Sequence, residues 1–196
     1  MVLRLIGCPF ECIPVDLAHG ENQGASFLAL NPLGRIPVLQ DGTLVLTEAA
    51  AICLHLADKH PGAGLVPPLG SAQRADVYRW LFYLSNTLQA EMFCWFYPER
   101  HADDPAAVDS VKAHAETRIA GMFDHLALHL SKGGPYLCGK DLSVADPFLL
   151  MLAYWALDMQ RPARAVPHLG RYLGRLAQLP AVTATFQAEG LAQPWF

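Results

Sequence analysis

The sequence predicts an α/β domain followed by an all-helical domain, and three observations carry this prediction. Two short β-prone runs are joined by Asp41-Gly42, a dipeptide that tolerates the positive φ angles of a tight hairpin turn. A stretch rich in proline and glycine follows from Pro61 to Gly70. Everything after it is helical in character. We therefore expect one domain over residues 1–64, a linker over 65–70 and a helical domain over 71–196.

The predicted hairpin pairs Ile36–Gln40 with Thr43–Thr47. Pro37 is the unusual residue, because proline donates no hydrogen bond and is confined to strand starts, edges or bulges. A proline at the start of a hairpin strand is a candidate for a cis peptide bond that turns the next amide and carbonyl outward. Such an exposed backbone pair, here at Val38, can hold an extended peptide by β-type pairing.

A helix is predicted directly after the hairpin. We expect Thr47 to cap it, with Glu48 in its first turn near the positive end of the helix dipole. Ile52, Leu54 and Leu56 lie within this helix, and Pro61-Gly62 ends it. An amide at the start of the helix is available to an anion. A purely structural role for Glu48, in which it completes the helix cap, stays open.

Composition excludes several classes of protein. The chain is 53% apolar and 16% charged, with a net charge of −4 and no basic run, so nucleic acid is not an expected partner. No apolar window is long enough for a membrane span and no signal-peptide pattern is present, so we expect a cytoplasmic protein that does not bind membranes. The five cysteines form no C-x-x-C pair, which argues against a disulfide framework and against a metal site.

The run Asn31–Leu39, the Asp41-Gly42 hairpin and the acidic helix start together resemble the glutathione S-transferase family, whose N-terminal domain is thioredoxin-like. The resemblance implies that Val38, after a cis Pro37, pairs with the cysteinyl part of glutathione. It also implies that Glu48 faces the γ-glutamyl end. The family's serine after this glutamate is Ala49 here, so we expect glutathione affinity to be lower by roughly 1–3 kcal/mol.

The first residues depart from the family pattern. Measured back from Asn31-Pro32, the resemblance implies that Met1–Ile6 are the last turns of the family's first helix and that Cys12–Leu17 form its second strand. The family's first strand and its catalytic Ser, Cys or Tyr are then absent, which leaves sheet edges unpaired. Two alternatives stay open. Val2–Ile6 could form a hairpin with Cys12–Asp16, or Cys8 could be a catalytic thiol, because Cys-Pro-Phe resembles the start of the catalytic helix in omega-class transferases and glutaredoxins.

Helix signals divide the second half of the chain. Ser71 is predicted to cap a long helix that ends near Tyr97, and Asp104-Pro105 to start a second one that ends near Leu130. The run Ser143–Asp146 has the form of a capping box in which the aspartate reaches back to the cap, and it resembles the family's S-x-A-D motif. Two final helices are predicted over 168–178 and 181–189.

The second half of the first long helix carries more aromatic surface than one core-facing stripe requires. In the family this helix lines the hydrophobic-substrate cleft. The resemblance therefore makes Tyr83, Phe93 and Tyr97 candidates for contact with an aromatic or alkyl ligand. Packing in the helical core or in a dimer seam is the alternative.

The resemblance implies a homodimeric enzyme that conjugates or reduces a small hydrophobic electrophile, with glutathione as co-substrate. We expect weak or atypical activity, because the usual catalytic residue is absent from the matching segment. The alternative is a non-catalytic protein of the same fold that binds a ligand or another protein.

Overall fold

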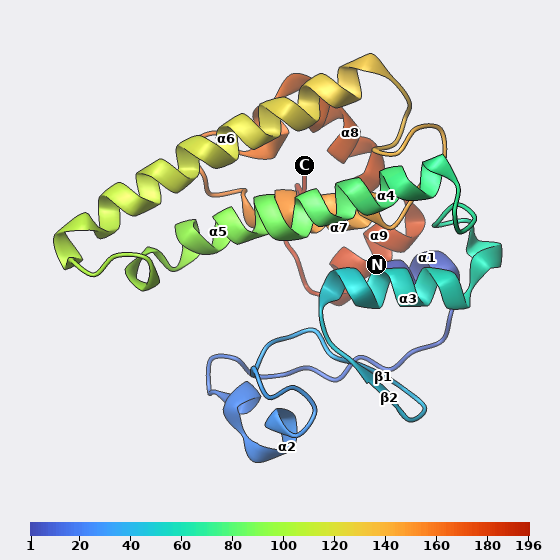
Figure 1. Cartoon of the computed structure of the whole chain (residues 1–196), viewed down its shortest axis with the longest axis horizontal. Helices are drawn as coiled ribbons and strands as arrows, with labels where there is room; N and C mark the ends of the chain where they lie inside the picture. Colours follow the sequence, from blue (N-terminus) through green and yellow to red (C-terminus); the bar gives the residue numbers. More distant parts are fainter.

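A computed structural model describes residues 1–196 and contains one small sheet and nine α-helices. The sheet is the antiparallel pair β1 (Leu39–Asp41) and β2 (Leu44–Leu46). Figure 1 shows the sheet and α2 at one end of the molecule, below α3 and α1, with the helices from α4 onward above or beside them. The helices are α1 (Val2–Ile6), α2 (Ala25–Leu28), α3 (Ala49–Lys59), α4 (Ala72–Tyr83), α5 (Gln89–Phe96), α6 (Val108–Lys132), α7 (Ala145–Trp155), α8 (Pro167–Ala177) and α9 (Pro180–Ala188).

The N-terminal residues are helical, as the family register predicts. Helix α1 ends at Gly7, whose φ of 75° closes the last turn. The alternative in which Val2–Ile6 forms a hairpin with Cys12–Asp16 is therefore wrong. The predicted strand Cys12–Leu17 is also wrong, because this segment has no regular structure. Residues 10–15 make no backbone hydrogen bond, and Pro14 has no N–H to give, so no neighbouring strand holds them in a ladder.

The predicted hairpin is confirmed. Leu39 pairs with Leu46 and Asp41 with Leu44, and the turn uses Gly42 at a φ of 61°. The Ile36–Pro37 peptide bond is cis, as predicted. Asp41 also accepts a hydrogen bond from Lys59 at the far end of α3, which ties the turn of the hairpin to the helix that follows it.

The long helix predicted from Ser71 forms, but it is not regular. The Ser71 side chain accepts a hydrogen bond from the amide of Arg74, which confirms the predicted cap. Residues 84–88 then form a π-helical segment between α4 and α5, which the sequence did not indicate. Single π turns of this kind are rare and are frequent at functional sites. Figure 1 shows α4 and α5 as one nearly continuous rod.

The remaining helices begin and end close to their predicted positions. Asp104 caps the next helix by accepting from the amide of Ala106 at 2.9 Å, ahead of α6. Helix α6 extends to Lys132, slightly past the predicted end, and α8 and α9 each lie within one residue of their predicted bounds.

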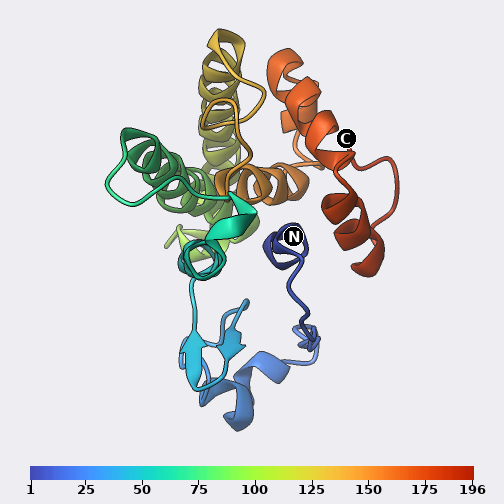
Figure 2. The same cartoon turned by 90° about the vertical axis from the view of Figure 1, so that its right-hand side faces the viewer.

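Helix α7 lies at the centre of the helical region (Figure 2). Asp146 in its first turn accepts from the amide of Ser143 at 2.7 Å, which confirms the reach-back half of the capping box. The apolar core continues from α7 through the other helices to Val2 of α1 and Leu56 of α3. None of the helices combines the length and the apolar character that a membrane crossing requires.

Candidate functional site

One end of the hairpin brings the predicted glutathione-binding residues together. Leu39 and Leu46 are the last pair of the ladder. Val38 precedes Leu39 by one residue and Glu48 follows Leu46 by two residues, so both lie at the same end of the hairpin. Val38 is half-buried and follows the cis Pro37, which is exposed. The amide of Val38 has no hydrogen-bond partner within the chain. It is therefore free to pair with an extended molecule laid along the strand.

Glu48 has an unusual backbone conformation. Its φ of 68° and ψ of 107° make it the one residue other than glycine with a positive φ. Such a conformation costs of order 1–3 kcal/mol and clusters at functional sites. Glu48 itself occupies the N-cap of α3, so the prediction that Thr47 caps this helix is wrong. The Glu48 side chain makes no capping hydrogen bond and is exposed, which leaves its carboxylate free for another group.

The start of α3 offers unpaired amides. The first hydrogen bond of the helix runs from the amide of Ile52 to the carbonyl of Glu48 at 2.9 Å, so the three amides before Ile52 have no partner inside the helix. Together with the positive end of the dipole they can bind a carboxylate. Ala49, the first helical residue, is half-buried and brings no hydroxyl to this position.

Four aromatic rings gather where α5 and α7 end, and we call them the aromatic cluster: Phe93, Phe96, Tyr97 and Trp155. Phe93 and Tyr97 stack with centroids 6.3 Å apart, and Trp155 lies 6.2 Å from Phe96. Phe93 is 37% exposed and Tyr97 is 40% exposed, so part of each ring is accessible, and the Arg100 guanidinium lies over the Tyr97 ring at 4.2 Å. Sequence reasoning missed Phe96 and Trp155, although Phe96 lay within the aromatic run that it singled out.

Tyr83 lies apart from the aromatic cluster. Its ring packs edge-on against Trp80 at 5.5 Å and lies 5.4 Å from the ring of His125 on α6. Burial raises the pKa of its hydroxyl. The π-helical segment separates Tyr83 from Phe93 and Tyr97 along the helix, so the structure does not bring the three predicted cleft residues together.

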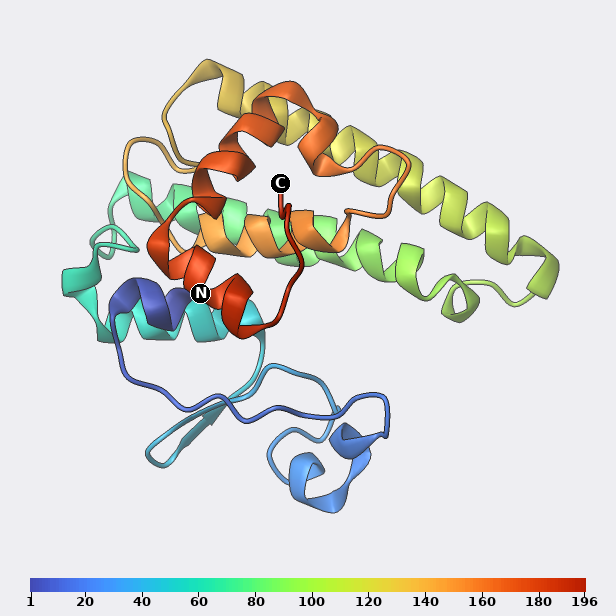
Figure 3. The same ribbon diagram turned by 180° about the vertical axis from the view of Figure 1, so that it is seen from behind.

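The start of α3 and the aromatic cluster lie toward the same side of the molecule. In Figure 1 and in the reverse view of Figure 3, α3 begins on the side toward which α5 extends from α4.

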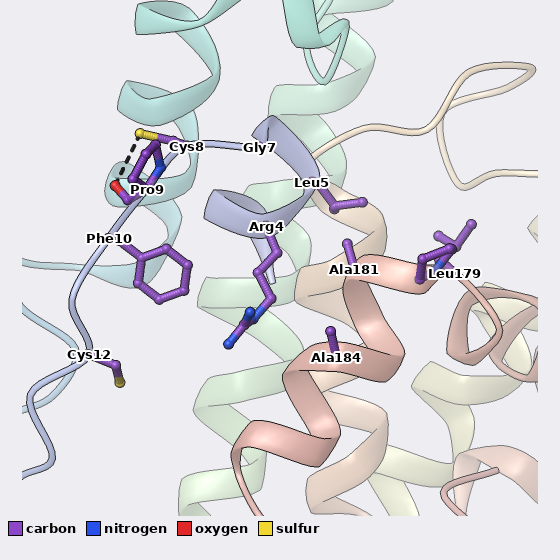
Figure 4. Close-up of a pocket in the computed structure, with 11 residues that line it drawn as sticks. Arg4, Leu5, Gly7, Cys8, Pro9, Phe10, Cys12, Leu179, Ala181 and Ala184 are labelled. Carbon is purple, nitrogen blue, oxygen red and sulfur yellow. Dashed lines mark hydrogen bonds between the residues drawn. The ribbon is translucent and has the colours of Figure 1, made fainter.

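Cys8 lies outside this arrangement. It follows the C-terminal end of α1, and its Sγ donates one weak hydrogen bond to the carbonyl of Pro9 at 3.5 Å. Its side chain lines an open cavity between α1 and α9 (Figure 4). No hydrogen bond joins Cys8 to Val38 or Glu48.

Comparison with known proteins decides the family. The model for the N-terminal domain of glutathione S-transferases matches residues 1–58, and the model for the C-terminal domain matches residues 88–188. The chain belongs to the glutathione S-transferase family. Its sheet and α3 form a reduced thioredoxin-like domain, and the helices from α4 onward form the family's helical domain.

Individual relatives match nearly the whole of this chain. The chain is 31% identical to glutathione S-transferase GstA of Escherichia coli O157:H7, over 97% of this chain and 92% of that protein. Among solved structures, a sphingomonad glutathione S-transferase complexed with glutathione is 35% identical, with a TM-score of 0.85 over 97% of this chain and 92% of that chain. A Sulfitobacter homologue with bound glutathione gives a TM-score of 0.87 at 26% identity, over 97% and 91% of the two chains.

Proposed function

We propose that this protein binds glutathione at the end of the hairpin and the start of α3. The cysteinyl part pairs with the backbone of Val38, and the γ-glutamyl carboxylate accepts from the free amides of α3. The observation that carries the proposal is that two separate sets of unpaired backbone amides lie at the same end of the hairpin. The positive φ of Glu48 supports it, since it turns the chain sharply between these two sets. The exposed Glu48 carboxylate is then available to the ammonium group of the same γ-glutamyl unit.

The proposed reaction is conjugation or reduction of a small hydrophobic electrophile held against the aromatic cluster. The thiol of glutathione becomes a strong nucleophile only as the thiolate, so a nearby donor raises the rate. Val38, Glu48 and Ala49 supply no side-chain hydroxyl or thiol. We therefore propose slow turnover, with binding and orientation as the main contributions of the protein.

A single substitution that adds a hydroxyl tests this site. Ala49→Ser places a hydroxyl at the first position of α3, where it can donate to the γ-glutamyl carboxylate. A hydrogen bond to a charged group contributes about 1–3 kcal/mol, so glutathione affinity measured by calorimetry is expected to rise roughly 5- to 150-fold. Ala50→Ser is the matched control, one residue further into the helix, and is expected to leave the affinity unchanged.

Loss of Glu48 tests the other end of the same site. Glu48→Ala is expected to weaken glutathione binding at least tenfold while circular dichroism stays that of the native protein, because the exposed carboxylate supports no other contact. A folded protein that takes up no glutathione, with or without these changes, contradicts the proposal. That result favours the non-catalytic alternative, in which the fold presents the aromatic cluster to a different ligand.

The aromatic cluster has its own test within the proposal. Phe93→Ala is expected to raise KM for an aromatic electrophile such as a chlorodinitrobenzene several-fold, with KM for glutathione unchanged. Leu69→Ala is the control, because Leu69 is an 83% exposed apolar residue in the linker, outside the cluster. Equal effects of the two variants on the electrophile contradict the placement of the substrate.

We also propose that the protein is a homodimer. Phe82 on α4 and Leu128 on α6 are large apolar side chains that are 57% and 56% exposed, and we propose that a second copy of the chain covers Phe82. Sedimentation of the wild type is expected to give twice the chain mass, and Phe82→Glu is expected to shift it toward the monomer. A monomeric wild type rejects this part of the proposal.

A further inference from the structure

The exposed face of α8 carries a row of basic side chains. His168, Arg171 and Arg175 follow one another at helical spacing and lie on one face of the helix. Arg164, in the turn just before α8, is held against the same helix, because its carbonyl oxygen lies only 2.3 Å from where a Cβ at Gly170 would stand. All four basic side chains are exposed, and we call them the basic row. Figure 3 shows α8 at the surface of the helical region, in front of α6.

The stretch that contains the basic row has no acidic residue. Between Asp158 and Glu189 the chain has four arginines and one histidine, but neither aspartate nor glutamate. Only one of these arginines forms an ion pair, Arg161 with Asp124 of α6, and it lies outside the row. The other arginines of the helical domain also pair with a carboxylate: Arg74, Arg79, Arg100 and Arg118. The three arginines of the basic row are therefore the ones in this domain that lack an acidic partner.

Contacts within the chain leave most donors of the basic row free. Arg164 makes no hydrogen bond, and Arg171 contacts only Nδ1 of His168, at 3.1 Å. Arg175 donates to the carbonyl of Pro135 at 2.7 Å, which fixes its position without neutralising its charge. Each guanidinium has five N–H donors, and a carboxylate takes two of them at once. Each arginine of the row can therefore bind a carboxylate from outside the chain.

The surface around the arginines is small and polar. Gly174, next to Arg175, brings no side chain, and a Cβ there would meet no atom within 4 Å, so the backbone of a partner can approach closely. No large apolar or aromatic side chain of α8 is exposed. The basic row thus offers charge and hydrogen-bond donors without an apolar surface.

These features favour one class of anionic partner over two others. A membrane surface is disfavoured, because peripheral helices bind lipid through an apolar face that this face of α8 lacks. Nucleic acid is disfavoured, because no exposed ring stacks on bases here and a long polyanion meets a protein with a net charge of −4 beyond the row. A short acidic protein segment fits, because its charge ends where the row ends and its carboxylates match the guanidinium fork.

We propose that the basic row is a docking surface for an acidic helical segment of a partner protein. From His168 to Arg175 the row extends about 10 Å, the rise of seven helical residues. A partner helix with glutamates at the same three- and four-residue spacing places its carboxylates opposite the guanidinium groups. The row does not include Val38, Glu48 or the aromatic cluster, so this inference does not depend on the function proposed above.

A model peptide tests the docking surface on the full chain. The probe is a fluorescein-labelled alanine-rich helix that carries glutamates at the spacing of the basic row, and its fluorescence anisotropy is measured as the protein is added. Saturable binding is expected at low salt. Because exposed charge pairs are screened by salt, the dissociation constant is expected to rise at least tenfold when the salt concentration is raised to about 0.5 M. The same peptide with glutamine in place of glutamate is expected not to bind.

Paired substitutions place the peptide on α8. The double variant Arg164→Gln/Arg171→Gln is expected to raise the dissociation constant at least tenfold. Arg35→Gln/Lys112→Gln removes the same charge from exposed positions outside the basic row and is expected to change it less than twofold. Arg175 is left in place because it also contacts the carbonyl of Pro135. Native circular dichroism of the first variant shows that the loss of binding comes from the lost charge and not from unfolding.

Three results overturn the proposal. The first is no binding of the glutamate peptide at low salt. The second is an equal loss of binding in the two double variants, which means that the peptide responds to the net charge and not to the row. The third is tighter binding of a short DNA duplex or of phosphatidylserine vesicles than of the peptide, which assigns the row to one of the other two partners. All arms are run without glutathione, so failure of glutathione binding leaves this test intact.

Discussion

The hydroxyl of Tyr172 on α8 donates a hydrogen bond of 2.6 Å to Oδ1 of Asp146 on α7, and both side chains are buried. The same carboxylate accepts from the amide of Leu137 and from the amide and hydroxyl of Ser143. Burial raises the pKa of Asp146, and the four donors oppose this by favouring its charged form. One aspartate thus joins the start of α7, the loop before it and α8.

Removing the Tyr172 hydroxyl tests this junction. Tyr172→Phe leaves a buried carboxylate with one donor fewer, and we expect a loss of about 1–3 kcal/mol in the free energy of unfolding. Urea denaturation measures this loss. Tyr154→Phe is the matched control, because its hydroxyl makes no hydrogen bond within the chain, and it is expected to cost much less. Equal losses in the two variants contradict the role given to Tyr172.

The ion pair between Arg74 on α4 and Asp58 on α3 gives an asymmetric prediction. Arg74 is 3% exposed and donates to Asp58 at 2.7 Å and to the carbonyl of Pro67 at 3.1 Å, whereas the Asp58 side chain is 54% exposed. Asp58→Ala leaves a buried guanidinium without its partner of opposite charge and is expected to lower the free energy of unfolding by roughly 2–4 kcal/mol. Arg74→Met leaves a carboxylate that water can reach, so it is expected to cost less. The urea denaturation midpoints of the two variants measure these losses. A larger loss in Arg74→Met than in Asp58→Ala contradicts the argument.

Local signals in the sequence account for most of what was predicted correctly. The Asp41-Gly42 turn fixes the hairpin, and Ser71 and Asp104 cap helices through hydrogen bonds to residues two or three positions away. These contacts need no partner from elsewhere in the chain. The hairpin register also places Val38 and Glu48 at one end, so that part of the candidate site could be predicted from the sequence.

The errors concern features that depend on distant partners. The residues 12–17 have the composition of a strand, yet a strand forms only beside another strand, and none pairs with them here. The positive φ of Glu48 and the π-helical segment at 84–88 run against local preference, so local sequence patterns do not predict them. Trp155 joins the aromatic cluster from α7, and spacing within one helix cannot reveal a ring from another.

The pairing of Arg161 with Asp124 gives a pH-dependent prediction. Both guanidinium NH2 groups donate to the carboxylate, at 2.8 Å and 2.5 Å, and this hydrogen bonding lowers the pKa of Asp124 below 3.8. A depressed pKa contributes stability that is present above the unfolded-state value and is lost as pH falls through the folded-state value.

Arg161→Gln tests this pair. Because the Asp124 side chain is more than half exposed, we expect the substitution to lower the free energy of unfolding by only about 0.2–1 kcal/mol at pH 7. This difference from the wild type is expected to disappear below about pH 4. Urea midpoints at pH 7 and pH 3 measure it. Arg164→Gln is the control for loss of a charge, and a gap that widens in acid contradicts the assignment.

The cysteines give the last prediction, because burial separates them into two classes. Burial raises the pKa of Cys53 to about 11 and that of Cys138 to about 12, whereas Cys12 is exposed. The thiolate is the species that iodoacetamide attacks, so at pH 8 the native protein is expected to be labelled at Cys12 well before Cys53 or Cys138. Labelling of these two is expected to increase sharply in urea, or as pH rises toward 11. Mass spectrometry of peptides after timed labelling measures each site. Early modification of Cys53 in folded protein at pH 8 means that α3 opens in solution far more readily than its packing against α1 and the helical region implies.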